Sequence, residues 1–271
     1  MNDFQNKIAV VTGAGSGIGR SIAQLLSRQG AIVHCVDLNV ANAQRVAGEC
    51  EKAVAHQADV TDAAAMVRLA ETIYQKDKRV DLLVNNAGIA HAGRFTDCEL
   101  QDWRRLLDVN VMGVVNGIHA FLPRMQAQGG AAHIVNTASG AGLFATAGLG
   151  PYCASKHAIV GLSQVLAAEL HGTPIGVTIL CPGMVNTPIL DAAQMRGEMA
   201  ARKSRTKAFY EKHAATPDKI ARDLLNDVRK KKLFCLTPRA EVGLGWMIQR
   251  LSPRLSQAVS RMLMKKLLET K

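Results

Sequence analysis

The fold of this chain is decided by one segment, Lys7-Ile8-Ala9-Val10-Val11-Thr12-Gly13-Ala14-Gly15-Ser16-Gly17-Ile18-Gly19. Lys7–Val11 has the apolar character of a buried β-strand, and a helical pattern runs from about Ile18 to Gln29. Glycines between them allow a tight turn and let an anion approach the free N–H groups at the start of the helix. The spacing Gly-x-x-x-Gly-x-Gly therefore predicts a strand–loop–helix unit that binds a pyrophosphate; a flexible glycine loop without a ligand is the alternative.

Short apolar strands and amphipathic helices alternate along most of the chain. Further strands are expected at Ile32–Asp37, Val54–Asp59, Leu82–Asn85, His133–Thr137 and Val177–Cys181, and further helices at Asn39–Cys50, Ala63–Gln75, Leu100–Gln126 and Tyr152–His171. This alternation predicts a single α/β domain over residues 1–271, a Rossmann-like, doubly wound parallel sheet with helices on both faces. Ligands of such sheets bind at the carboxyl ends of the strands.

Composition agrees with this class. Apolar residues make up 48% of the 271 residues and aromatic residues only 4%, which suits an Ala/Val/Gly-rich helix-and-sheet protein better than a β-sandwich. No apolar run approaches the roughly 18–20 residues that span a bilayer, and the early first strand leads us to expect no secretory signal. The six cysteines are scattered without a Cys-x-x-Cys pair, so we expect reduced thiols in a cytoplasmic protein.

The positive charge is concentrated in the last quarter of the chain. Residues 196–271 hold 19 Lys/Arg and 7 Asp/Glu, whereas residues 1–195 hold 14 and 15. One helical stripe carries Leu244, Ile248, Leu251, Leu255, Ala258 and Met262, bordered by Arg250, Arg254, Arg261 and Lys265, and Ser252-Pro253 should break it into two helices. Residues 239–271 are thus a basic amphipathic tail. It packs on its own core or on a neighbouring subunit, or it rests on an anionic membrane surface; we do not expect nucleic acid as a partner.

Asp37 ends the second expected strand, 18 residues after Gly19. A carboxylate there can accept both hydroxyls of an adenosine ribose and repel a 2′-phosphate. Ser16 and Leu38 occupy the positions that could hold a compensating cation, and neither is basic. The sequence therefore favours NAD over NADP; the alternative is that Asp37 caps the following helix.

Tyr152 and Lys156 lie four residues apart on an expected helix, with Ser139 upstream. The two side chains share one helix face, so an ammonium can stabilise a phenolate whose ordinary pKa is about 10. A serine hydroxyl can hold a substrate oxygen beside the phenol. Together they suit proton transfer to or from an alcohol or ketone.

These motifs occur in one order over about residues 5–190. They are Thr12–Gly19, Asp59-Val60, Asn85-Asn86-Ala87-Gly88, Asn110, Ser139, Tyr152 with Lys156, and Pro182-Gly183. In this order and spacing the chain resembles the short-chain dehydrogenase/reductase family. The resemblance implies an NAD(P)-dependent oxidoreductase acting on CH–OH groups, assembled as a homotetramer or homodimer through the helices at Leu100–Gln126 and Tyr152–His171.

The resemblance also assigns site residues. It implies that catalysis uses Asn110, Ser139, Tyr152 and Lys156, with Tyr152 as acid/base, Lys156 lowering its pKa and binding the nicotinamide ribose, and Asn110 holding a relay water. The cofactor would contact Gly13, Ser16, Gly17, Ile18, Gly19, Asp37, Leu38, Asp59, Val60, Asn86, Ala87, Gly88, Tyr152, Lys156, Pro182, Gly183, Val185 and Thr187. Thr187, which precedes Pro188, has ordinary turn chemistry as its alternative.

The expected substrate wall is almost wholly apolar. It comprises Ser139, Leu143, Phe144, Leu149, Tyr152, Met184, Ile189 and Leu190, with residues 186–215 as a variable lid. Because no Arg or Lys is evident there, we expect a hydrophobic sterol-, retinoid- or lipid-like alcohol or ketone. A biosynthetic NADPH reductase and a non-catalytic dinucleotide-sensing or scaffold protein are the alternatives. The histidines show no metal-ligand spacing, so no metal is expected, and Cys153 lacks a base partner and is interpreted as structural.

Overall fold

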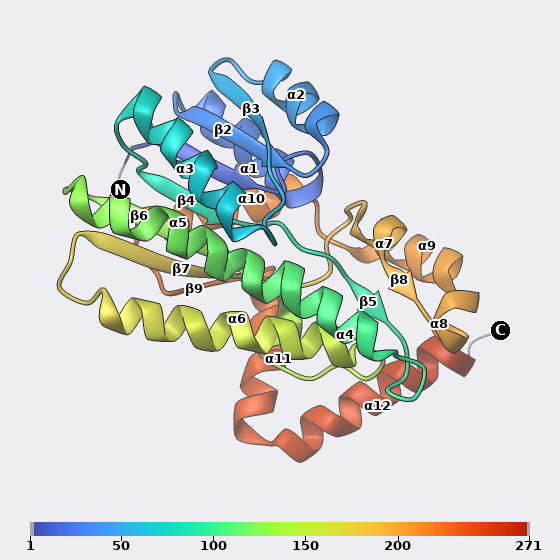
Figure 1. Cartoon of the computed structure of the whole chain (residues 1–271). Helices are drawn as coiled ribbons and strands as arrows, with labels where there is room; N and C mark the ends of the chain where they lie inside the picture. The colour runs from blue at the N-terminus through green and yellow to red at the C-terminus, as the bar shows by residue number, and fades with distance from the viewer. Residues whose placement is uncertain (1–2, 270–271) are drawn as a thin grey trace.

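Seven parallel strands form one sheet in the computed structural model, which describes residues 3–269, with side chains up to residue 262 (Figure 1). In spatial order the strands are β3 (Ala53–Gln57), β2 (Ile32–Asp37), β1 (Ile8–Thr12), β4 (Leu82–Asn85), β6 (Ala132–Thr137), β7 (Ile175–Pro182) and β9 (Phe234–Thr237). The chain builds the sheet outward from β1, first through β2 to β3 on one side and then through β4 to β9 on the other, as in a doubly wound sheet. The predicted Rossmann-like class is confirmed.

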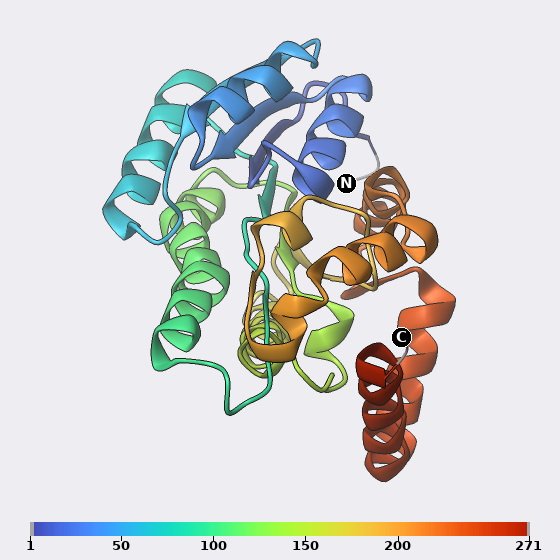
Figure 2. The same ribbon diagram turned by 90° about the vertical axis from the view of Figure 1, so that its right-hand side faces the viewer.

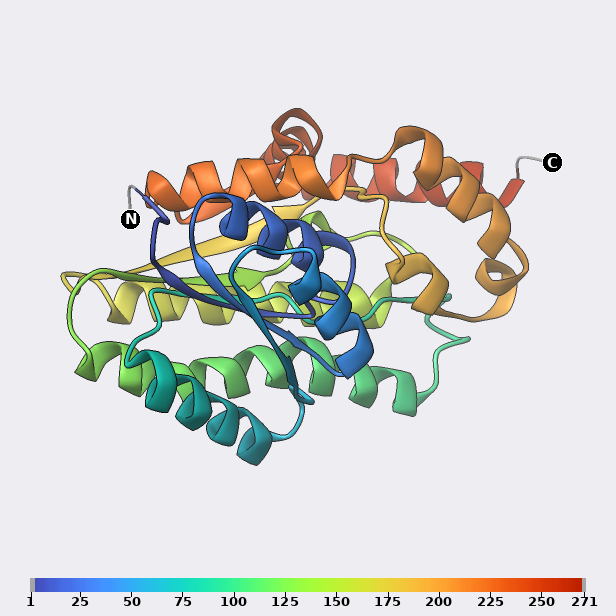
Figure 3. The same cartoon turned by 90° about the horizontal axis from the view of Figure 1, so that it is seen from above.

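Helices cover both faces of the sheet (Figure 3). One face carries α1 (Gly17–Arg28), α2 (Val40–Gly48) and α10 (Pro217–Arg229), and the other carries α3 (Ala63–Asp77), α5 (Gly113–Ala127) and α6 (Gly150–Glu169). Along β1, Ala9 and Val11 pack on the first face while Ile8 and Val10 pack on the second. Burial on both sides explains why the strand is a continuous apolar run rather than an alternating one.

Several elements differ from the sequence prediction; α10 and the short strands β5 (His91–Ala92) and β8 (Gln194–Met195) were not predicted. The seventh strand, β9, was not predicted, because it has only four residues and follows the charged run at 229–232. The single helix expected at Leu100–Gln126 is α4 (Leu100–Leu106), a π-helical segment (Leu107–Met112) and α5. A π-helical turn adds a residue to the helical ladder and shifts the side chains that follow.

This interrupted helix is long and apolar enough, by length and composition, to cross a membrane, contrary to the expectation that no run would be. In the structure part of its apolar surface serves the core. Phe121 and Met125 are fully buried with residues of α3 and the strands, whereas Leu100, Leu107 and Met112 are exposed. A core helix passes the same test of length and composition, and packing explains the buried part of the pattern.

The last third of the chain adds short elements beside the sheet (Figure 2). The expected lid contains α7 (Ile189–Ala192), β8 (Gln194–Met195), which pairs with β5 (His91–Ala92), α8 (Gly197–Ala201) and α9 (Lys203–His213). The tail forms α11 (Arg239–Leu251) and α12 (Pro253–Glu269), and the break predicted at Ser252-Pro253 is confirmed. The side chain of Lys265 lies outside the described side chains.

Buried histidine makes stability depend on pH. Burial lowers the pKa of His133, which is 1% exposed, to about 3, against about 6.5 in the unfolded chain. The unfolded state therefore binds the extra proton below pH 6.5, so stability decreases as the pH falls from 6.5 toward 3. From this residue alone the free energy of unfolding should drop by about 2 kcal/mol between pH 7 and pH 5.

Urea unfolding at several pH values measures this dependence. His133→Gln should flatten it, because glutamine does not titrate, whereas His171→Gln at an exposed position should leave it unchanged. Equal pH profiles for the His133→Gln variant and the parent protein would contradict the prediction.

Candidate active site

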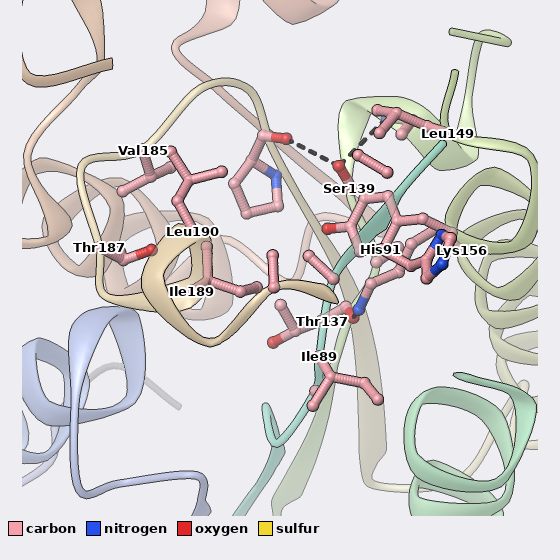
Figure 4. A pocket seen from close by; sticks show the side chains of 18 of the residues that line it. Ile89, His91, Thr137, Ser139, Leu149, Lys156, Val185, Thr187, Ile189 and Leu190 are labelled. Carbon is pink, nitrogen blue, oxygen red and sulfur yellow. Dashed lines mark hydrogen bonds between the residues drawn. The ribbon is translucent and has the colours of Figure 1, made fainter. Parts of the chain in front are cut away.

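A single cavity of about 1920 Å³ lies at the carboxyl ends of the strands. Its lining includes the glycine loop, the ends of β2, β4, β6 and β7, the start of α6, the lid and the tail. In Figure 4, Ser139, Leu149, His91 and Lys156 lie on one side, and Val185, Thr187, Ile189 and Leu190 lie on the other. Drug-sized pockets occupy roughly 300–1,000 Å³, so this volume has room for a dinucleotide and a second molecule.

The glycine loop is built for close approach of backbones. Gly13 has φ +62°, and a Cβ there would lie 2.8 Å from Ala87 Cα, so a side chain is excluded. The Thr12 hydroxyl accepts hydrogen bonds from Asn86 N at 3.0 Å and Ala87 N at 3.1 Å. These bonds fix the loop to the end of β4, leaving Gly13, Ser16, Gly17, Ile18, Asn86, Ala87 and Gly88 in the cavity wall.

Gly19 lies behind the wall formed by the loop. It is not among the cavity-lining residues, and a Cβ on it would collide with the carbonyl oxygen of Gly13. A glycine here lets α1 pack beneath the loop, and its contact with the cofactor stays a prediction.

Asp37 braces the loop from the end of β2. Its carboxylate accepts hydrogen bonds from Gly15 N at 2.9 Å and from Asn39 N at 2.9 Å. Asn39, not Asp37, caps α2, since its side chain accepts from the first amides of that helix, so the capping alternative is wrong. Sequence reasoning missed Arg45, whose Nη2 donates to Gly15 O at 2.7 Å and places a cation beside this loop.

The remaining predicted cofactor residues also reach the cavity. Its wall includes Leu38, Asp59, Val60, Pro182, Gly183, Val185 and Thr187. The methyl group of Thr187 would lie 3.1 Å from a Cβ on Gly17. The segment after β7 therefore packs against the glycine loop, and the two ends of a dinucleotide site lie within one surface.

Tyr152 and Lys156 lie one turn apart on α6, as predicted. The Lys156 ammonium is 5.7 Å from the centre of the Tyr152 ring and donates to Thr137 O at 2.9 Å. The Ser139 hydroxyl hydrogen-bonds the Tyr152 phenol and accepts from Ala141 N at 3.1 Å. Serine, phenol and ammonium thus converge on one patch of the cavity wall.

Burial sets the protonation of this group. It raises the pKa of Tyr152 to about 12, while the hydrogen bond from Ser139 acts in the opposite direction. Burial also lowers the pKa of Lys156 to about 8. In the protein alone Lys156 is not among the groups that shift the pKa of Tyr152, since its ammonium donates to the Thr137 carbonyl, and its role in lowering that pKa stays a prediction. The neutral phenol is a proton donor.

Asn110 is placed by the π-helical segment. Its Oδ1 accepts from Ile89 N at 2.9 Å, and its Nδ2 donates to Ile89 O at 3.0 Å and to Ser155 Oγ at 3.0 Å. The side chain is fully buried and does not line the cavity. Its visible contacts hold the chain after β4 against α6; the relay water stays a prediction.

An ion-pair cluster next to the cavity was not predicted. His91, which lines the cavity, has Nε2 3.2 Å from Asp102 Oδ2. Arg196 of the lid contacts both oxygens of this carboxylate, Nε at 2.7 Å and Nη2 at 3.1 Å. Asp102 is 2% exposed, and the hydrogen bonds from Arg196 hold its pKa below the ordinary value. We call Asp102–Arg196 the lid clamp, because it joins α4 to the segment between β8 and α8.

The substrate wall is less uniform than expected. Phe144, Leu149, Met184, Ile189 and Leu190 line the cavity, but Leu143 packs in the core among residues of α5, α6 and β7. Arginines also line the whole cavity at four positions, Arg104, Arg105, Arg202 and Arg205, so the cavity as a whole carries cations beside the apolar wall. The tail also contributes, through residues such as Leu244, Ile248 and Val259.

Comparison with known proteins identifies the fold and site together. The sequence pattern described as short chain dehydrogenase matches residues 7–196. The chain belongs to this family of oxidoreductases. The match covers the glycine loop, the Ser139, Tyr152 and Lys156 group and the segment after β7; α9 to α12 lie beyond it.

Individual relatives agree with this assignment. Cyclohexanol dehydrogenase of Acinetobacter sp. is 38% identical over 194 residues, 70% of this chain and 77% of the relative. D-threitol dehydrogenase of Mycolicibacterium smegmatis is 38% identical over 227 residues, 81% of this chain and 85% of the relative. The probable oxidoreductase EphD of Mycobacterium tuberculosis is 34% identical over 96% of this chain, which spans only 45% of EphD.

Solved structures show the same architecture. A short chain dehydrogenase/reductase from Burkholderia phymatum in complex with NAD superposes with a TM-score of 0.86 at 32% identity, covering 93% of this chain and 96% of that one. A 3-ketoacyl-(acyl-carrier-protein) reductase from Brucella melitensis complexed with NADH gives a TM-score of 0.74 at 30% identity, covering 86% and 96%.

The lid clamp can be tested without a substrate. Arg196→Gln should leave the buried Asp102 carboxylate without its cation and loosen the lid, so that trypsin cleaves α9 on the order of tenfold faster. Arg94→Gln is the matched control, because Arg94 pairs with Glu198 of the same lid at 3.1 Å but both side chains are more than half exposed. Equal cleavage rates for Arg196→Gln and Arg94→Gln would contradict the clamp.

Proposed function

We propose that this protein is an NAD-dependent dehydrogenase that oxidises a hydrophobic secondary alcohol, or reduces the corresponding ketone. The observation that carries the proposal is the convergence of Ser139, Tyr152 and Lys156 on a largely apolar cavity shared with the glycine loop and Asp37. A sensing or scaffold protein does not need this group complete. Cyclohexanol dehydrogenase and D-threitol dehydrogenase support an alcohol as the substrate class, although threitol is a polyol.

The residues suggest a division of labour. NAD, when bound against the glycine loop, Asp37 and Thr187, would supply the hydride acceptor. The Ser139 hydroxyl would hold the substrate oxygen beside the phenol. Tyr152 would accept the alcohol proton as phenolate, or donate it to a ketone as neutral phenol. A charged Lys156 would favour the phenolate, in opposition to the burial that raises its pKa.

The experiment is an NAD-reduction screen across sterols, retinoids, long-chain alcohols, cyclohexanol and polyols. Tyr152→Phe should lower turnover of any active substrate by about 10²–10⁴ while NADH binding, followed by fluorescence, stays unchanged. Tyr74→Phe is the control: it removes a half-buried phenol oxygen that donates to Gln128 Oε1 at 2.7 Å, at a position outside the cavity lining. Full activity of Tyr152→Phe would overturn the mechanism, and turnover of polyols alone would overturn the substrate class.

The second candidate is an NADPH-dependent carbonyl reductase, which Arg45 beside the glycine loop favours. Asp37→Ser removes the carboxylate that would repel a 2′-phosphate, so the ratio of NADPH to NADH affinity should rise on the order of 100-fold. Adding Arg45→Gln should cancel part of this gain. A parent protein that already prefers NADPH would support the second candidate.

The proposal extends to assembly and location. Homodimers or homotetramers would form through α4, the π-helical segment, α5 and α6, where Leu107, Met112 and Val165 are exposed. Light scattering of the purified protein would measure the mass. A cytoplasmic location with peripheral membrane contact fits the exposed apolar residues and arginines of α11 and α12.

A further inference from the structure

The pair of helices α11 and α12 carries an apolar stripe that borders the cavity and is largely exposed to solvent. Its large apolar side chains are Leu244, Met247 and Leu251 on α11, and Leu255 and Met262 on α12, exposed by 54%, 51%, 79%, 53% and 61%. We call these five residues the outer stripe. They follow helical spacing on each helix, so each set lies along one side.

The outer stripe is not needed to hold the helices in place. Their inner side is already fixed: Val242 is fully buried under β7 and β9, and Ser260 Oγ accepts from Ala147 N at 2.8 Å. Ile248 and Val259 share the helix side of the outer stripe by their spacing, and they line the cavity. Packing of the tail on its own core thus accounts for the side of the helices that carries Val242, and leaves the outer stripe unexplained.

Arginines border the outer stripe. Arg250, Arg254 and Arg261 are exposed, and each directly precedes a stripe residue in sequence. Within residues 239–262 the only carboxylate is Glu241, whose Oε1 accepts from Met184 N at 3.2 Å beside the cavity. The outer surface therefore combines apolar area with positive charge that these helices do not neutralise.

We propose that the outer stripe and its three arginines dock on an anionic lipid surface. Leucines and methionines would enter the boundary between headgroups and acyl chains, and the guanidinium groups would meet lipid phosphates. A second copy is a poorer occupant, because a two-fold contact through this face would bring two sets of like charges together. Leu244 belongs to both the outer stripe and the cavity lining, so the docked face borders the cavity.

This placement would let a lipid-soluble substrate pass directly between bilayer and cavity. That consequence alone rests on the proposed function. Binding to lipid does not, so a test that measures binding separates failure of this proposal from failure of the enzymatic one.

Co-sedimentation of the full chain with phosphatidylcholine vesicles, with and without phosphatidylglycerol, tests the proposal. The protein should sediment only with the anionic vesicles, and high salt should weaken the binding. Leu251→Gln/Leu255→Gln should weaken it on the order of tenfold, and Arg250→Gln and Arg254→Gln by roughly fivefold each.

Two control variants separate this patch from general properties of the chain. Arg222→Gln removes an exposed charge of the same basic quarter on α10, and Val40→Gln removes an exposed apolar side chain on α2. Both should bind vesicles like the parent. Absence of parent binding, or equal losses in the control variants, would overturn the proposal. So would a dimer in solution that Leu251→Gln/Leu255→Gln converts to monomer without any effect on lipid binding.

Discussion

The parallel direction of all seven strands constrains everything else in this molecule. Because both faces are covered by helices, strand residues such as Val10 and Val11 are apolar on each side, and polar side chains concentrate where the strands end. Thr12, Asp37, Asn86 and Ser139 all occur at or just after carboxyl ends, and the parallel pairing brings these ends to one edge. A site for cofactor and substrate follows from topology before any individual residue is considered.

Burial of Lys156 at this edge of the sheet is unfavourable for folding. A lysine that is 4% exposed, with its pKa lowered from 10.5 to about 8, destabilises the folded protein by about 3 kcal/mol at neutral pH. The hydrogen bond to Thr137 O offsets part of this, and no carboxylate contacts the ammonium among its described partners. A purely structural position would carry an apolar residue. Retention of an ammonium beside a buried phenol is therefore best explained by chemistry.

Local signals made the fold and the main site predictable. The glycine loop, Asp37 and the Tyr152–Lys156 spacing each lie within one strand–loop–helix unit, where sequence neighbours are spatial neighbours. The direction of individual side chains was less predictable where packing decides it: Leu143, expected at the substrate wall, packs into the core.

Contacts between residues far apart in the chain could not be predicted from the sequence. Asp102 and Arg196 are 94 positions apart, and each alone looks like an ordinary surface charge. Arg45 lies 30 positions from the Gly15 carbonyl that it contacts, so its contact with the glycine loop was equally hidden. Only the fold brings these charges to the site.

The tail lies outside the part of the chain that carries the reaction chemistry, but it contributes to the wall of the cavity. Residues 7–196, which match the family pattern, contain the serine, phenol, ammonium and glycine loop, so likeness to dehydrogenases supports the shared chemistry. The far wall of the cavity is built from α9, α11 and α12, outside that match. The stripe seen in the sequence did not show which of its residues are covered: Ile248 lines the cavity, while Leu251, three residues on along the same side of α11, is 79% exposed. An apolar stripe that borders the cavity along one part and is exposed along the rest needs two apolar neighbours. A hydrophobic substrate at the cavity and lipid along the exposed part would satisfy both, and the same chemistry would then explain the cavity wall and the surface beside it.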